Sequence, residues 1–89
     1  MVGKRGECVV SQSIDGSLLF TLRLLKILSE EEKVSLRDAF TATGADAYYL
    51  DSRVSGGTGF HVRATPGQQE KAVRKILRTL SVKVQRLTG

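Results

Sequence analysis

Apolar and polar residues alternate over the run 18–28, which is the pattern of a strand with one buried face. The even positions from 18 to 24 are all apolar, and Thr21 and Arg23 lie between them. Leu19, Leu25 and Ile27 interrupt this alternation, so the run is also compatible with a helix that is apolar nearly all round. We interpret it as a strand whose opposite face is exposed to solvent.

Turn residues divide the remaining alternating runs into hairpins. Asp15–Gly16 is a preferred pair for a tight turn and predicts that 8–14 pairs antiparallel with the run that follows. The runs 46–54 and 59–64 bracket a Ser- and Gly-rich segment and predict a second hairpin, and 82–84 predicts a last strand. In the second hairpin the residues expected to face the core are Tyr48, Leu50, Phe60, Val62 and Ala64.

The first helix is predicted over 30–43 by the signals at its two ends. Ser29 and Glu32 have the spacing of a capping box, and Gly44 is placed to end the helix. Three acidic residues in the first turn suit the positive end of the helix dipole. The side chains expected on its core face are Leu36, Ala39, Phe40 and Thr43.

The second helix is predicted from Thr65 to Leu80. Thr65 and Gln68 have the spacing of another capping box, and Pro66 fits the first helical position. One face carries an apolar stripe of Ala72, Val73, Ile76, Leu77 and Leu80, and the opposite face carries a basic stripe of Lys71, Arg74, Lys75 and Arg78.

These elements predict a single α+β domain over residues 1–89. Each helix has one apolar stripe and the strands have one apolar face, so both helices should cover the same face of an antiparallel sheet in a two-layer sandwich. From Leu18 onward the order is that of the ferredoxin-like βαββαβ motif. The run 8–14 is expected as an extra strand at the edge of the sheet.

Two resemblances follow from this element order. The stretch 45–87 resembles the second half of ACT-type regulatory domains, but the loop 28–30 lacks the Asp and Gly with which such domains bind amino acids. The leading hairpin is similar to that of small translation initiation factors that bind the small ribosomal subunit, although 43–46 lacks their Cys- and Gly-rich motif. Neither resemblance assigns the chain to a family.

Charge is distributed unevenly along the 89 residues, which carry a net charge of +5. Residues 1–52 hold 6 basic and 8 acidic side chains, or −2, whereas residues 53–89 hold 8 basic and 1 acidic, or +7. Such a concentrated positive field suits an anionic partner, although the same surface could serve only solubility.

The strand pattern predicts a nucleic-acid interface on the sheet face that the helices leave open. Cations mixed with stacking rings are what single-stranded nucleic acid requires, and RNA is expected rather than DNA. The residues predicted for this face are Arg23, Tyr49, Arg53, His61, Arg63, Lys83 and Gln85, with Tyr49 as the stacking ring. The basic stripe of the second helix, on another face, is a further candidate contact or simply a solvated surface.

Catalytic and metal chemistry have little support in the sequence. Asp51 and His61 have the same strand parity, so a carboxylate could orient the imidazole, but a nucleophile is missing. Cys8 and His61 are single residues of their types and form no zinc cluster. The glycine-rich loop 55–59 is followed by a strand, whereas phosphate-binding loops precede a helix. We expect a hairpin turn there, no enzymatic activity, no metal and no cofactor.

Location and assembly follow from the same residues. A lone Cys8 forms no internal disulfide, and the apolar run 8–10 is too short for a signal peptide, so a cytoplasmic protein is expected. The longest apolar run, 18–28, contains two cations and is too short to span a membrane. This run has more apolar residues than a strand with one covered face requires, which favours a homodimer, unless Leu25 and Ile27 pack under the turn into the first helix. The alternative to nucleic-acid binding is therefore an oligomeric protein-interaction or ACT-like regulatory module.

Overall fold

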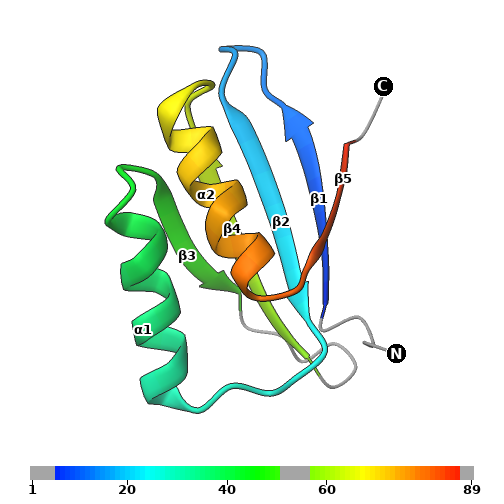
Figure 1. The fold of residues 1–89 in the computed structure, drawn as a ribbon, viewed down its shortest axis with the longest axis vertical. Helices are drawn as coiled ribbons and strands as arrows, with labels where there is room; N and C mark the ends of the chain where they lie inside the picture. Colours follow the sequence, from blue (N-terminus) through cyan, green and yellow to red (C-terminus); the bar gives the residue numbers. More distant parts are fainter. Residues whose placement is uncertain (1–5, 51–56, 87–89) are drawn as a thin grey trace.

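The protein folds into one five-stranded sheet covered on one face by two helices (Figure 1). The structure, a computed structural model, describes residues 6–50 and 57–86. In chain order the elements are β1 (Gly6–Gln12), β2 (Leu18–Leu24), α1 (Glu30–Thr41), β3 (Asp46–Leu50), β4 (Thr58–Ala64), α2 (Gln68–Thr79) and β5 (Lys83–Arg86). The predicted α+β sandwich is confirmed.

The position of β1 in the sheet differs from the prediction. The strand order is β3-β4-β2-β1-β5, so β1 lies between β2 and β5 and not at the edge. Because the hairpin places β1 on the side of β2 that the last strand of a ferredoxin-like motif would take, β5 pairs with β1 instead. That pairing is parallel, which makes the sheet mixed and not antiparallel throughout as the sequence predicted. The four-residue β5 suits an edge, because it is short and two of its residues are charged, which discourages further pairing.

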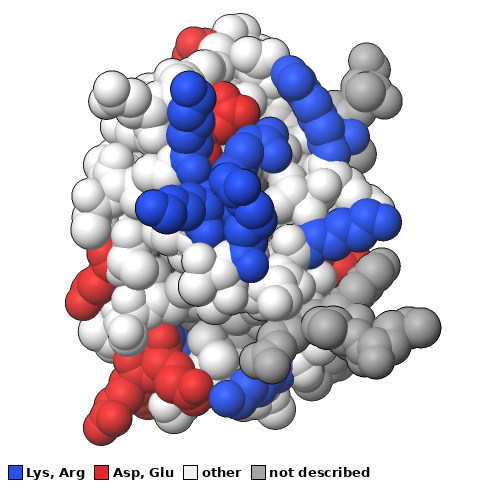
Figure 2. Space-filling view, in the orientation of Figure 1, with Lys and Arg blue, Asp and Glu red and all other residues white. Residues whose placement is uncertain are grey.

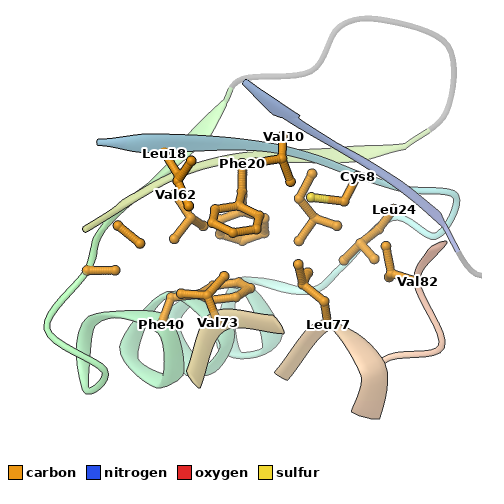
Figure 3. Close-up of a cluster of buried hydrophobic side chains, with 14 residues drawn as sticks. Cys8, Val10, Leu18, Phe20, Leu24, Phe40, Val62, Val73, Leu77 and Val82 are labelled. Atoms are coloured by element: carbon orange, nitrogen blue, oxygen red, sulfur yellow. The ribbon is translucent and has the colours of Figure 1, made fainter. Parts of the chain in front are cut away.

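The core lies between the sheet and the helices (Figure 3). The even residues of β2 are buried and its odd residues are more exposed, so the strand interpretation of 18–24 is confirmed. Phe20 and Val62 point from the sheet towards Phe40, Val73 and Leu77 of the helices (Figure 3). All five side chains are fully buried and supply much of the apolar area that stabilises the fold.

Helix α1 begins as the sequence predicts but contributes less to the core. The Ser29 Oγ accepts a hydrogen bond from the Glu32 N–H, and the Glu32 carboxylate accepts one from the Ser29 N–H, completing the capping box. Gly44, with a φ of 92°, lies just beyond the end of the helix. Of the predicted core stripe only Phe40 is buried, whereas Leu36 is half-buried and Ala39 exposed. The side of α1 that carries Leu36 and Ala39 is therefore not covered by the core.

Helix α2 starts three residues later than predicted, and its predicted capping box is wrong. Pro66 and Gly67 form a turn, and Gly67 takes the N-cap position with a φ of 105° and no side-chain cap. The Gln69 Oε1 instead accepts a hydrogen bond from the Thr65 N–H at 3.0 Å. The positive φ of Gly67 explains the shift, because a residue in this conformation cannot be part of a right-handed helix, so α2 begins only after it. Val73 and Leu77 are buried as predicted.

The parity of β3 is opposite to the prediction. Tyr49 pairs with Phe60 and lies on the helix side, while Tyr48 pairs with His61 and lies on the open side. Both parities of this five-residue strand carry apolar side chains, so alternation alone did not distinguish them. The inward positions of β4, at Phe60, Val62 and Ala64, are confirmed.

A buried hydroxyl ties β4 to the segment that leads into α1. The Thr58 Oγ1 accepts a hydrogen bond from the Leu28 N–H and donates one to the Lys26 carbonyl, both at 3.0 Å. Thr58 is the one buried polar residue among those described. It therefore satisfies two backbone groups within the irregular connection between β2 and α1.

We predict that Thr58→Val lowers the free energy of unfolding by about 1–3 kcal/mol, because it keeps the side-chain shape but leaves both backbone groups without this partner. Urea denaturation measures the change. Thr58→Ser retains the hydroxyl and is the matched control. A serine variant less stable than the valine variant would contradict a hydrogen-bonding role.

Candidate nucleic-acid interface

Five of the residues predicted for the open sheet face are found there. Arg23, His61, Arg63 and Lys83 share the strand parity that faces away from the helices, as does Gln85. Arg23, Arg63 and Lys83 are exposed and His61 is half-buried. Arg53 lies outside the described residues.

Tyr49, the predicted stacking ring, is not on this face. Its ring packs edge-on against Phe60, with the centroids 5.7 Å apart, and Lys33 Nζ lies 4.4 Å from its centroid. The open face carries Tyr48 instead, which is 49% exposed and meets His61 edge-on at 5.6 Å. Because these two rings are nearly perpendicular, at 82°, they do not form a flat platform for successive bases.

The open sheet face is nearly neutral in charge. Glu7 is the cross-strand neighbour of both Arg23 and Lys83, and Asp46 is the neighbour of Arg63. Three cations and two carboxylates among the described residues leave a net charge of +1. The positive field expected from the sequence therefore does not lie mainly on this face.

Helix α2 carries the basic stripe that the sequence predicts. Lys71, Lys75 and Arg78 are exposed, whereas Arg74 is half-buried. Arg74 Nε donates a hydrogen bond to the Glu70 carboxylate at 3.1 Å, and the guanidinium carbon lies 5.7 Å from the centroid of the Phe20 ring. Arg74 is thus fixed against the sheet, and the other three side chains extend into solvent around it.

Arg86 extends this basic surface and was missed by the sequence reasoning. It is the register partner of Val10, a core residue, so its parity places it on the helix side of β5. The sequence did carry a signal for this, because Arg86 has the same parity as Val82 and Val84, but the last strand was predicted only over 82–84. We call Lys71, Arg74, Lys75, Arg78 and Arg86 the α2–β5 patch.

The α2–β5 patch is the main concentration of positive charge on the helix side of the molecule. Figure 2 shows basic side chains gathered over α2, with others towards β5 on the same face. Five cations and Glu70 give a net charge of +4. Among the described residues, Arg74 alone of the five forms an ion pair.

Acidic charge is segregated at the start of α1, at the lower left of Figure 2. Glu30, Glu31 and Glu32 occupy the first turn. The pKa of Glu32 is lowered, chiefly by the hydrogen bond from the Ser29 backbone and then by Lys26. The lowered pKa keeps Glu32 charged at neutral pH. This acidic turn repels an anionic ligand, which favours the approach of such a ligand towards α2 and β5.

The structure gives Cys8 no features of a nucleophile. Its side chain is fully buried, and burial raises the pKa of the thiol to about 12 although the nearby charge of Arg74 lowers it in part. Asp51, proposed to orient His61, lies outside the described residues. Gly59 of the glycine-rich loop belongs to β4, and Ser55 and Gly56 lie outside the described residues. Within 6–50 and 57–86, no three His, Cys, Asp or Glu residues are grouped as metal ligands.

Cys8 is expected to resist a thiol reagent at pH 8 in the folded protein. A pKa of about 12 leaves roughly a thousandfold less thiolate than an ordinary thiol, and burial blocks access as well. The rate of reaction with Ellman's reagent should therefore be at least about a hundredfold lower than in denaturant. Similar rates in both states would contradict the burial of Cys8.

The comparisons with known proteins give no assignment. No family model matches the chain, and neither the curated proteins nor the solved structures include a match. In the part of the chain that the structure describes, neither helix is long and apolar enough to cross a membrane.

Proposed function

We propose that this protein binds the phosphodiester backbone of a nucleic acid through the α2–β5 patch. The observation that carries the proposal is the cluster of four exposed cations, Lys71, Lys75, Arg78 and Arg86, which have no ion-pair partners among the described residues. Unpaired cations gathered on one face release bound counterions from a polyanion, which is the main source of non-specific affinity for nucleic acids.

The spacing of these cations suits contact with several phosphates. Lys71 and Arg78 are separated by seven residues along α2, which corresponds to about 10 Å of helix axis. Arg86 adds a cation from the neighbouring strand. Glu70 is held by Arg74, so its negative charge is partly neutralised within the patch.

The patch contains no aromatic side chain and therefore favours recognition of backbone over bases. A duplex presents about one charge per 1.7 Å of its axis, twice the density of one strand, so duplexes should bind more tightly than single strands. The sequence-based preference for RNA depended on stacking rings of the sheet face. It does not extend to this patch, and we expect RNA and DNA duplexes to bind alike.

Binding should weaken steeply with salt. If the four unpaired cations each contact one phosphate, the logarithm of the binding constant falls with the logarithm of salt concentration with a slope of about −3.6. Affinity for a labelled duplex should then drop by about 150-fold between 50 and 200 mM salt. Fluorescence anisotropy measures this slope, and binding that hardly changes with salt would contradict the proposal.

The double variant Lys75→Gln and Arg78→Gln locates the interface. It should lower duplex affinity by at least about tenfold at 50 mM salt and make the salt slope shallower by about two. Arg23→Gln and Arg63→Gln together remove the same charge from the open sheet face and form the matched control. This control should retain most of the affinity.

Two outcomes would count against this interface. Equal losses in the two double variants would mean that net charge alone governs binding. A larger loss in the sheet-face variant, together with tighter binding of single strands, would transfer the interface to the open face with Tyr48 and His61. Circular dichroism of each variant verifies that the fold is retained.

A further inference from the structure

An apolar groove of about 640 Å³ lies between α1 and α2, where both helices meet the end of β2. We call it the interhelix groove. Its apolar wall consists of Leu24, Leu28, Leu36, Ala39, Ile76 and Leu80. Glu31, Glu32, Ser35 and Thr79 complete the lining.

The groove exists because the two helices do not close on each other. Phe40 is the single buried residue of α1, so Leu36 and Ala39 line the groove and do not fill the core. Ile76 and Leu80 are only partly buried on the α2 side. Leaving such apolar surface in water costs free energy that a docked apolar group would recover.

Exposed apolar side chains lie beside this groove, on the connection from β2 to α1. Leu25 is 56% exposed and Ile27 is 71% exposed, so neither packs under the turn as the sequence allowed. Lys26 lies between them, and its neighbours Leu24 and Leu28 contribute to the groove wall.

The connection that carries these side chains is held in place. Thr58 bonds to the Lys26 carbonyl and to the Leu28 N–H, and Lys26 Nζ lies 3.3 Å from the Glu32 carboxylate. Ile27 is therefore presented on a backbone that is fixed on both sides. Such preorganisation reduces the entropy that binding would cost.

We propose that the interhelix groove receives the segment 25–27 of a second copy of this chain, forming a two-fold symmetric dimer. The segment carries Lys26 between two apolar side chains, and the groove is apolar with Glu31 and Glu32 at its edge. Lys26 pairs with Glu32 of its own chain, whereas Glu31 forms no ion pair among the described residues and is the carboxylate that can face Lys26 of the second copy. Segment and groove thus match in both hydrophobicity and charge.

The placement of the two parts satisfies the requirement of a two-fold interface. In such an interface the same patch lies on both subunits, so each subunit must present both the inserted segment and the groove that receives it. Leu24 and Leu28, which line the groove, flank the segment 25–27 in the chain, so the segment and the groove belong to one patch. Each copy can then insert Ile27 into the other.

Dimerisation through this patch leaves the α2–β5 patch exposed. On the helix wheel of α2, Ile76 and Leu80 lie nearly opposite Lys71 and Arg78. The inference is therefore independent of the proposed function, and its test uses the protein without nucleic acid.

Sedimentation equilibrium over about 10–500 µM protein tests the dimer, a range in which micromolar association is visible. The full chain is expected to have twice the mass of one chain at the upper concentrations. Ile27→Ser removes the inserted side chain from both subunits and should weaken the dimer by at least about thirtyfold. Ala39→Gln obstructs the groove from an exposed position of α1 and should act similarly.

The matched controls make the same changes elsewhere. Ile14→Ser alters the fully exposed isoleucine of the β1–β2 turn, and Ala42→Gln alters an exposed alanine at the end of α1 that does not line the groove. Both variants should remain dimeric. Thermal unfolding by circular dichroism establishes that all four variants are folded.

Two results would overturn the proposal. A chain that stays monomeric throughout the concentration range has no such interface. A dimer that survives both Ile27→Ser and Ala39→Gln uses another surface, such as a sheet edge. Dissociation by these two variants, with both controls intact, supports the interhelix groove as the subunit interface.

Discussion

The register of β2 decides which side chains of the sheet face the helices. This strand is paired along its whole length with β1 on one side and β4 on the other. Its four even residues, from Leu18 to Leu24, are buried against the helices. A slip of one residue would turn all four to the open face and bring Arg23 into the core, so the apolar pattern determines one register. The faces of β1 and β4 follow from it, as does the side on which both helices pack.

Much of the fold was predictable because its signals are local. The alternation of β2, the hairpin turn at Asp15–Gly16 and the capping box at Ser29 each act within a few residues, and all three predict features that the structure contains. The start of α2 was misplaced because Pro66 and Gly67 form a turn that competes with a plausible cap. Local patterns therefore predicted which elements form better than they predicted where each element begins and ends.

Features that depend on distant parts of the chain were not predictable. Tyr48 and Tyr49 are equally suited to either face, and pairing with β4 decided between them. The placement of β1 between β2 and β5 likewise depends on which strand has an unpaired edge when β5 joins the sheet. For the candidate site, the helix stripe was visible in the sequence, whereas the near neutrality of the sheet face depends on cross-strand neighbours such as Glu7 and Lys83.

The parallel pairing of β1 with β5 also determines the order in which the chain can fold. The β1–β2 hairpin is local and can form early, but the other edge of β1 acquires its partner only when the last strand is available, because Cys8 lies opposite Val84. Until then β1 presents unpaired backbone groups along a strand that carries Cys8 and Val10. During synthesis on the ribosome, the nascent protein thus exposes an unpaired sheet edge until residues 83–86 have emerged and can pair with it.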